Sequence, residues 1–275
     1  MRPEANSRRL LSYARSKAKM YEYGVAEQYH IQIPQDPANL FTLTIGVLGE
    51  FAARYDSAAV MPPERRSELR EGMRFASQFF DAYLQSRLNG VADELLLLLG
   101  SAAYYLCDLP GSASVLASRL NEDQLDLEGY GLERLLAWYL KGHFNTWPTI
   151  EQSLYSPLVQ EVIASAMMFS IEGSEEDVLL ENLRKLRDLA YTDGTARQLL
   201  LADTLLAVAI RRLENSTWKA LPGYSGLPIE RWREVLGRPN FIRELWPAQH
   251  LLGQSDVLRG RSAVVQMPTS AGKTK

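Results

Sequence analysis

The sequence predicts a mainly α-helical fold, a helical bundle or a solenoid-like array of antiparallel helix pairs, which is followed after residue 260 by one short strand and a loop. Three observations support this fold class. Apolar residues recur at three- and four-residue steps through most of the chain, the period of an amphipathic helix. No alternating apolar and polar pattern appears before residue 260. Proline, glycine and asparagine clusters divide the periodic stretches into segments of helix length.

The composition is that of a folded protein with a substantial core. The 275 residues are 46% hydrophobic and 23% charged, with a formal net charge of −3. A chain of this length allows one large domain or two small ones, and it can bury a core without disulfide or metal staples. It is too apolar to be disordered throughout. Its single cysteine, Cys107, excludes an intrachain disulfide and a cysteine-rich zinc site.

The chain carries no signal for export or for a membrane span. The polar, basic N-terminus is not followed by the apolar stretch of a secretory signal. The longest apolar run, residues 95–106, is interrupted by Gly100 and Ser101 and is shorter than the ~20 residues that cross a bilayer. We therefore expect a cytoplasmic protein without a membrane partner, in which this run is a buried core helix.

Helical periodicity predicts the elements of the body in order. In the first helix Leu10, Leu11, Ala14 and Ala18 share one face. The helix over 91–107 is apolar nearly all round, so it should lie at the centre of the fold. The helices are expected over residues 7–28, 39–55, 61–89, 91–107, 112–120, 127–141, 157–170, 174–191 and 195–214.

Local signals set the ends of these helices. Asn39 can cap the second helix, Pro63 suits the first turn of the third, and Asn89-Gly90 ends the third. Ser174 is expected to cap the helix that follows it, and the acidic residues next to Ser174 are favoured by the helix dipole.

Two short segments of the chain have similar sequences, which is consistent with a repeat architecture. Residues 103–106 read Ala-Tyr-Tyr-Leu, and residues 137–140, which follow 34 residues later, read Ala-Trp-Tyr-Leu. This separation is the period of a tetratricopeptide helix pair. An irregular helical bundle is the default, with the solenoid-like array as its alternative.

A change in composition suggests where the body ends. Residues 218–226 contain Pro222, Gly223 and Gly226, which is typical of a linker, and the charge balance turns basic beyond them. We therefore predict an all-helical domain over residues 1–217, with a linker and a connecting helix over residues 218–239.

Two basic ends flank an acidic body. Residues 1–20 and residues 231–275 each carry a net charge of +5, so residues 21–230 carry −13. Basic ends can meet phosphates, whereas an acidic body repels them. We therefore expect the acidic helical body to bind a protein partner rather than nucleic acid. For the basic first 20 residues, a solvated helix face without a partner is the alternative.

The last residues of the chain predict a strand and a phosphate-binding loop. Residues 262–267 favour a strand, and residues 268–274 read Pro-Thr-Ser-Ala-Gly-Lys-Thr. Small residues let backbone N–H groups hold phosphates, while Lys273 offers a charge to the β- and γ-phosphates and the Thr274 hydroxyl suits Mg²⁺. The Gly-x4-Gly-Lys-Thr pattern is not met literally, because Met267 stands at its first glycine. The predicted phosphate-binding residues are Thr269, Ser270, Ala271, Gly272, Lys273 and Thr274.

This loop resembles motif I of superfamily-two helicases, and it is closest to the Ski-like DExH-box branch. Gln249, which lies 24 residues before Lys273, resembles the glutamine of the Q motif, whose amide reads the adenine edge. Phe241 or Trp246 would pack near the base. The resemblance covers residues 240–275. It implies that they begin a RecA-like α/β domain that binds ATP and Mg²⁺, and that the helicase core contacts nucleic acid.

The same resemblance implies parts that lie downstream of motif I. The acidic Mg²⁺ ligand and the catalytic glutamate of the DExH motif belong there, as do the arginine fingers. Asp93-Glu94 precedes a helical leucine run and is not that motif. No complete catalytic set is therefore expected in these residues, which we interpret as the front of a longer helicase. Its long helical extension resembles those of bacterial antiphage-defence helicases, the Hachiman type among them.

Two hypotheses from different classes result. In the first, the chain is the N-terminal region of an ATP-dependent nucleic-acid helicase or translocase. Its helical domain then acts in regulation or partner docking. In the second, it is a non-enzymatic helical module that binds a protein and retains an incomplete nucleotide site.

Overall fold

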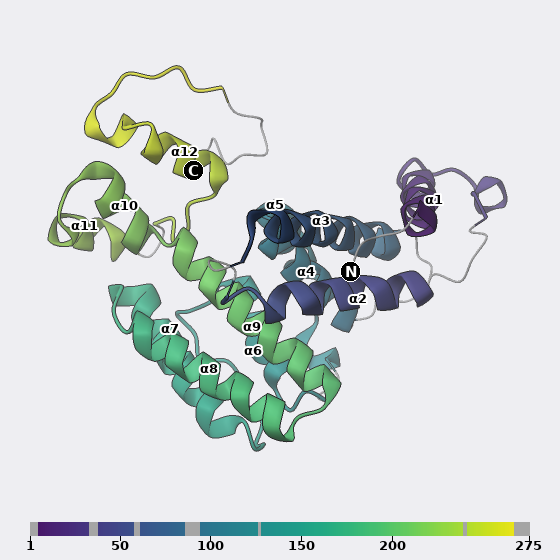
Figure 1. Cartoon of the computed structure of the whole chain (residues 1–275), viewed down its shortest axis with the longest axis horizontal. Helices are drawn as coiled ribbons and strands as arrows, with labels where there is room; N and C mark the ends of the chain where they lie inside the picture. The colour runs from purple at the N-terminus through teal and green to yellow at the C-terminus, as the bar shows by residue number, and fades with distance from the viewer. Residues whose placement is uncertain are drawn as a thin grey trace.

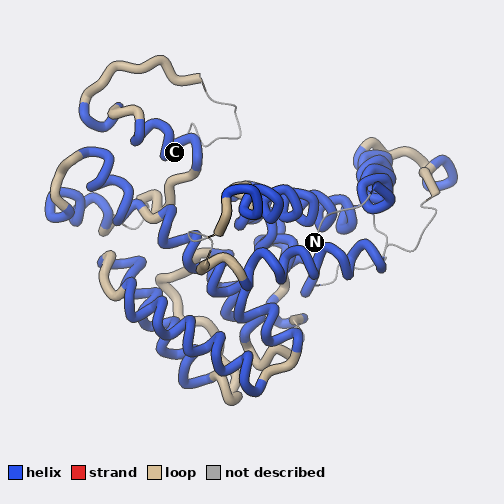
Figure 2. Tube along the Cα trace, viewed as in Figure 1, coloured by secondary structure: helices blue, strands red, loops and turns tan. Residues whose placement is uncertain are grey.

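The protein is built of α-helices. A computed structural model describes residues 5–32, 38–57, 61–85, 94–125, 128–238 and 241–266. Figure 2 shows only helices and loops in these ranges, apart from one isolated antiparallel bridge between Ser216 and Glu244. The helices are α1 (Ala5–Glu22), α2 (Ala38–Ala53), α3 (Pro63–Gln85), α4 (Glu94–Leu106), α5 (Pro110–Arg119), α6 (Leu132–Lys141), α7 (Ser156–Glu172), α8 (Glu176–Asp193), α9 (Ala196–Asn215), α10 (Thr217–Ser225), α11 (Ile229–Leu236) and α12 (Pro247–Gln254). The mainly helical fold class is confirmed.

Helix α9 is the centre around which the body is assembled. It contacts α2, α4, α6, α8 and α10 (Figure 1), and its residues between Leu201 and Ala209 are all buried. Contacts between α9 and α2 join residues more than 140 positions apart. A solenoid has contacts only between neighbouring repeats, so these contacts favour the bundle over the solenoid-like array.

The apolar helix α4 lies in the core, as its sequence predicts. All its residues from Leu96 to Leu106 are buried, between α3 and α5. Gly100 permits this close approach, because a Cβ atom there would lie 3.0 Å from Phe80 Cβ and 3.2 Å from Leu116 Cδ1. In the part of the chain that the structure describes, no helix combines the length and the apolarity needed to cross a membrane.

The start of α9 agrees with the helix predicted over residues 195–214. Thr195 caps α9 through a capping box with Gln198: Thr195 Oγ1 accepts from Gln198 N, and Gln198 Oε1 accepts from Thr195 N. The prediction for Ser174 is wrong. Glu175 occupies the N-cap of α8 at φ 63°, without a side-chain hydrogen bond. Asn39 lies inside the first turn of α2 rather than before it.

The segment predicted as a linker is helical. Residues 218–225 belong to α10, with Trp218 and Leu221 buried and Pro222 inside the helix. Ser216 caps α10 by accepting from the backbone N of Trp218 at 3.2 Å. The proline and glycine composition suggested a turn, but the burial of two large apolar side chains and the serine cap outweigh that local preference.

The strand predicted over residues 262–267 is not formed in its described part. Residues 261–266 are loop, and Val264 is fully exposed at 101% relative accessibility. A strand needs a neighbour that completes its backbone hydrogen bonds, and the described residues provide none. Met267 and the loop that follows it lie outside the described residues.

An ion pair between α8 and the turn after α2 makes stability depend on pH. Arg184 of α8 donates to Asp56 through Nε at 3.0 Å and Nη2 at 2.8 Å. These hydrogen bonds lower the pKa of Asp56 more than its partial burial raises it. A carboxyl with a lowered folded-state pKa stabilises the fold above its unfolded pKa of about 3.9, and this contribution is lost as the pH falls through the folded-state pKa.

We expect Asp56→Asn to lower the free energy of unfolding by less than ~1 kcal/mol at neutral pH, since both partners are partly exposed. The difference should disappear in urea titrations at a pH below the lowered folded-state pKa of Asp56, where the native carboxyl becomes protonated. Asp188→Asn, at an exposed position of α8 without an ion pair among the described residues, is the control and should show no such pH dependence. A loss for Asp56→Asn that is equal at both pH values would contradict the assignment.

Candidate functional site

The residues predicted to read adenine lie in a small C-terminal lobe. This lobe comprises α10, α11, α12 and their connections, at the end of the molecule opposite α1 (Figure 1). It has its own hydrophobic cluster, separate from the main core. The buried members of this cluster are Trp218, Leu221, Leu236 and Leu245. The predicted phosphate-binding residues 269–274 lie outside the described residues, so their role stays a prediction.

Gln249 is the third residue of α12 and holds its first turn. Its Oε1 accepts from the backbone N of Trp246 at 2.8 Å, which satisfies one of the free N–H groups at a helix start. The side chain is half-buried, and its Nε2 donates to none of the described residues. An amide oxygen has two lone pairs, so Gln249 keeps a donor and an acceptor for a ligand.

The two aromatic candidates pack into different clusters. The ring of Trp246 meets Tyr105 of α4 edge-on, with centroids 5.3 Å apart, and it packs against the main core. Phe241 packs against the cluster of the lobe. The described residues therefore do not bring Trp246 and Phe241 together around one slot, and their contact with adenine stays a prediction.

Helix α12 packs directly against α10. Gly253 faces the ring of Tyr224 so closely that an added Cβ would lie 2.1 Å from Tyr224 Cδ2. The Tyr224 hydroxyl hydrogen-bonds His250 Nδ1 at 2.7 Å. Burial, together with the charge of Arg211, lowers the pKa of His250, which favours a neutral ring. Arg259 adds hydrogen bonds to the carbonyls of Gly223 and Tyr224, so the chain beyond α12 is also tied to α10.

Backbone pairing attaches this lobe to the end of α9. Leu245 N donates to Asn215 O at 2.7 Å, and Thr217 N donates to Arg243 O at 3.0 Å. The Thr217 hydroxyl donates to Ile242 O at 3.0 Å. The segment that leads into α12 is therefore fixed to the last turn of the central helix.

A buried ion-pair network lies at this attachment point. Arg212 of α9 contacts Glu244 through Nη1 at 2.8 Å and donates through Nη2 to the carbonyl of Tyr139 at 2.9 Å. The hydroxyl of Tyr105 donates to the other carboxylate oxygen of Glu244 at 2.6 Å. The side chains of Arg212 and Glu244 are only 15% and 13% exposed. Burial and the charge of Glu244 raise the pKa of Tyr105 well above 10, so this hydroxyl stays a donor.

Aromatic rings contact the guanidinium group of Arg212. Arg212 Cζ lies 4.7 Å from the ring centroid of Phe144 and 5.6 Å from that of Tyr105, which gives cation–π contacts on α4 and on the loop after α6. The network therefore joins three parts of the body to Glu244, three residues before the first residue of the lobe's helix α12.

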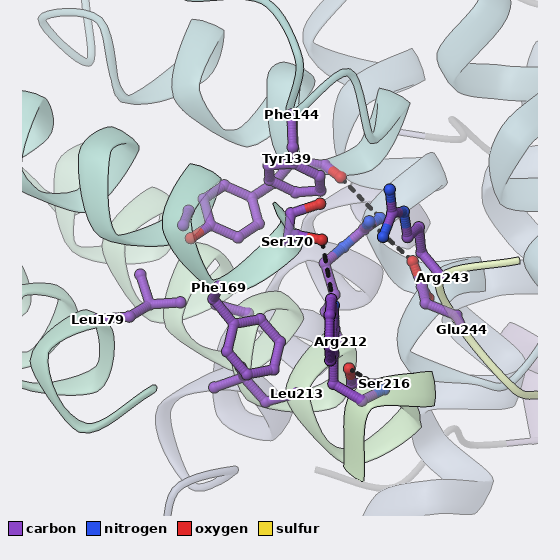
Figure 3. A pocket seen from close by; sticks show the side chains of 13 residues that line it. Tyr139, Phe144, Phe169, Ser170, Leu179, Arg212, Leu213, Ser216, Arg243 and Glu244 are labelled. Carbon is purple, nitrogen blue, oxygen red and sulfur yellow. Dashed lines mark hydrogen bonds and ion pairs between the residues drawn. The ribbon is translucent and has the colours of Figure 1, made fainter. Parts of the chain in front are cut away.

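A small cavity adjoins the network (Figure 3). Its volume is about 30 Å³, and its lining combines apolar side chains with Arg212, Arg243, Ser170 and Glu244. Two buried polar atoms in its lining residues, Arg212 Nε and the Tyr139 hydroxyl, have no hydrogen-bond partner among the residues that the structure describes. A space of this size has room for water but not for a nucleotide. We interpret it as part of the junction, not as a catalytic site.

Sequence analysis missed this junction. Arg212 continues the apolar stripe Leu201, Leu205 and Val208 of α9 at helical spacing, and an arginine on such a stripe is a signal for a buried ion pair. Its partner Glu244 could not be identified in the same way, because Glu244 lies outside the helices, in the segment between α11 and α12.

The described residues were also searched for side chains that could bind a metal ion. Within the described residues no group of His, Cys, Asp and Glu side chains is arranged to hold a metal ion. Thr274, the residue predicted to contact Mg²⁺ through bound ATP, lies outside them.

Comparisons of the chain with protein-family models, with curated proteins and with solved structures gave no match.

Proposed function

We propose that this chain is the N-terminal region of a cytoplasmic, ATP-dependent nucleic-acid helicase or translocase. The observation that carries the proposal is the run Pro-Thr-Ser-Ala-Gly-Lys-Thr over residues 268–274, with Gln249 24 residues before Lys273. In this proposal Gln249 binds adenine, Lys273 binds the β- and γ-phosphates, and Thr274 contacts Mg²⁺. The resemblance of the helical extension to those of antiphage-defence helicases adds a role in antiviral defence.

The helical body would then act in regulation or partner docking. The attachment of the lobe supports this part of the proposal. Gln249 lies on a helix whose leading segment is paired with the end of α9 and whose Glu244 is ion-paired with Arg212. Movement of this segment upon ATP binding would be transmitted to the central helix. The charge of −13 over residues 21–230 favours a protein as the partner of the body.

Replacing Lys273 tests the proposed ATP site. In the natural protein that contains this chain, Lys273→Ala is expected to reduce ATP hydrolysis to background, because the charge that holds the β- and γ-phosphates is removed. Release of phosphate and binding of a fluorescent ATP analogue are the measurements. Lys275→Ala removes a neighbouring lysine outside the motif and should leave both unchanged. Normal hydrolysis by Lys273→Ala would show that the site assignment is wrong.

The coding sequence separates this proposal from the interaction module. A helicase requires a DExH sequence within roughly another hundred residues downstream, inside the same nucleotide-binding domain. A reading frame without such a sequence would exclude the helicase and leave the protein-binding module.

A further inference from the structure

The cavity at the junction between the body and the C-terminal lobe is lined by a cation without a counter-charge. This cation is Arg243, a half-buried residue of the segment between α11 and α12. Its Nη1 donates to the carbonyl of Leu236 at 2.6 Å, and its side chain makes no other hydrogen bond and no ion pair with the described residues. Burial lowers the pKa of Arg243, but a guanidinium keeps its charge in proteins. A half-buried charge without a partner is unfavourable, and an anion would offset this cost.

Arg212 lines the same cavity and has one free donor. Its Nη1 contacts Glu244 and its Nη2 donates to the carbonyl of Tyr139, whereas its buried Nε has no partner among the described residues. This atom can only donate, so only an acceptor satisfies it. A buried donor without a partner, in a residue that lines a cavity, indicates a water molecule or an ion there.

The charged side chains of the lining have a net positive charge. They are the cations Arg212 and Arg243 and the carboxylate of Glu244. One oxygen of Glu244 is engaged by Arg212, and the other accepts from the hydroxyl of Tyr105. The charges of Arg212 and Glu244 cancel, so the charge of Arg243 remains. The lining therefore favours an anion over a neutral or positively charged ligand.

The size and the walls of the cavity restrict this anion. The cavity volume of about 30 Å³ is close to the ~30 Å³ that one water molecule occupies in the liquid. A phosphate group is too large for this space, whereas a halide such as chloride is about as large as a water molecule. Figure 3 shows the apolar side chains Phe169 and Leu179 on the side of the cavity opposite Arg243. These apolar side chains offer no hydrogen bonds, so the arginines must hold the ion.

Water is the alternative occupant, and charge distinguishes the two. A water molecule can accept from Arg212 Nε, but it has no net charge and must donate its own two protons to acceptors. A halide accepts from several donors at once and offsets the unpaired charge of Arg243. The cavity is partly open to solvent, which gives an ion access.

We propose that this cavity binds one chloride-sized monovalent anion, held by Arg243 and Arg212. The site goes beyond the proposed helicase function, because none of its residues belongs to the predicted ATP site. Arg212 belongs to α9, and Arg243 is bonded to the end of α11 through Leu236. An anion between the two arginines therefore strengthens the attachment of the lobe to the central helix.

The test compares thermal unfolding of the whole 275-residue chain in sodium chloride, sodium bromide and sodium gluconate at equal ionic strength, since gluconate is too large for the cavity. Chloride and bromide are expected to raise the Tm by about 2–4 °C relative to gluconate when their concentration is about tenfold above the dissociation constant. Arg243→Met should lose this dependence on the anion. Arg233→Met removes an exposed cation of the same lobe that does not line the cavity, and it should keep the dependence.

A crystal of the unmodified chain grown with sodium bromide locates the ion directly. We expect an anomalous difference peak in the cavity, within hydrogen-bond distance of the guanidinium of Arg243. This measurement needs no variant to fold. Circular dichroism checks that Arg243→Met and Arg233→Met keep their helix content.

Three outcomes would overturn the proposal. Equal Tm values in the three salts would mean that the cavity holds water only. Bromide peaks at the surface, with none in the cavity, would show an adventitious ion only. An equal loss of the anion dependence in Arg243→Met and Arg233→Met would indicate a general charge effect. All these measurements are made without ATP, so their failure leaves the predicted ATP site untouched.

Discussion

Replacing Arg212 with methionine is expected to lower the free energy of unfolding by about 3–5 kcal/mol, because it leaves Glu244 as a buried carboxylate without its cation. The substitution also removes the hydrogen bond to the carbonyl of Tyr139 and the cation–π contacts with Phe144 and Tyr105. Urea unfolding of the whole chain measures the loss. The lobe should also become more accessible to protease around Glu244, since the ion pair fixes it to α9.

The double variant Arg212→Met/Glu244→Gln tells us the source of this loss. If the unpaired charge causes most of it, replacing Glu244 by a neutral isostere should recover a large part of the stability. Arg211→Met is the control on the same turn of α9. Arg211 is 19% exposed and its partners Asp108 and Glu214 are more exposed, so its loss should be smaller. A cost for Arg212→Met within ~0.5 kcal/mol of zero would contradict a structural role for the network.

The second large effect is expected at Gly173, which ends α7. This residue has φ +70°, and an added Cβ would lie 2.7 Å from Trp218 Cδ2. The Trp218 ring has little freedom to move, because it is buried and its Nε1 donates to the carbonyl of Ser170 at 3.2 Å. Gly173→Ala therefore combines backbone strain of about 1–2 kcal/mol with overpacking of about 1–3 kcal/mol.

Gly24 provides a control with matched backbone geometry. It has φ +67°, and an added Cβ there would meet nothing within 4 Å. Gly24→Ala should therefore show the backbone strain alone, about 1–2 kcal/mol. The difference between the two variants in urea unfolding reports how tightly Trp218 is held against α7. Equal losses at Gly173 and Gly24 would mean that the Trp218 ring moves aside without cost.

Local sequence signals predicted most helices of the body, but they did not predict the long-range contacts that hold the chain together. The start of α9 could be predicted because Thr195 and Gln198 form a cap within four residues. The helix α10 could not, because it depends on burying Trp218 and Leu221 against other parts of the chain. The same limit applies to the site. Gln249 stands out by its spacing from Lys273, whereas Tyr105 and Glu244 meet across 139 residues and no local pattern connects them.

The central position of α9 also governs the order in which the protein can fold during its synthesis. Helices α2 and α4 are made early, but the helix that covers both of them is completed only at Asn215. At typical synthesis rates of about 5–20 residues per second, the ribosome needs roughly 10–30 s to proceed from the end of α2 to the end of α9. Throughout that interval the surfaces of α2 and α4 that α9 covers in the finished fold lack this cover. Chaperone binding or aggregation of the emerging chain should therefore be concentrated before residue 215 is released.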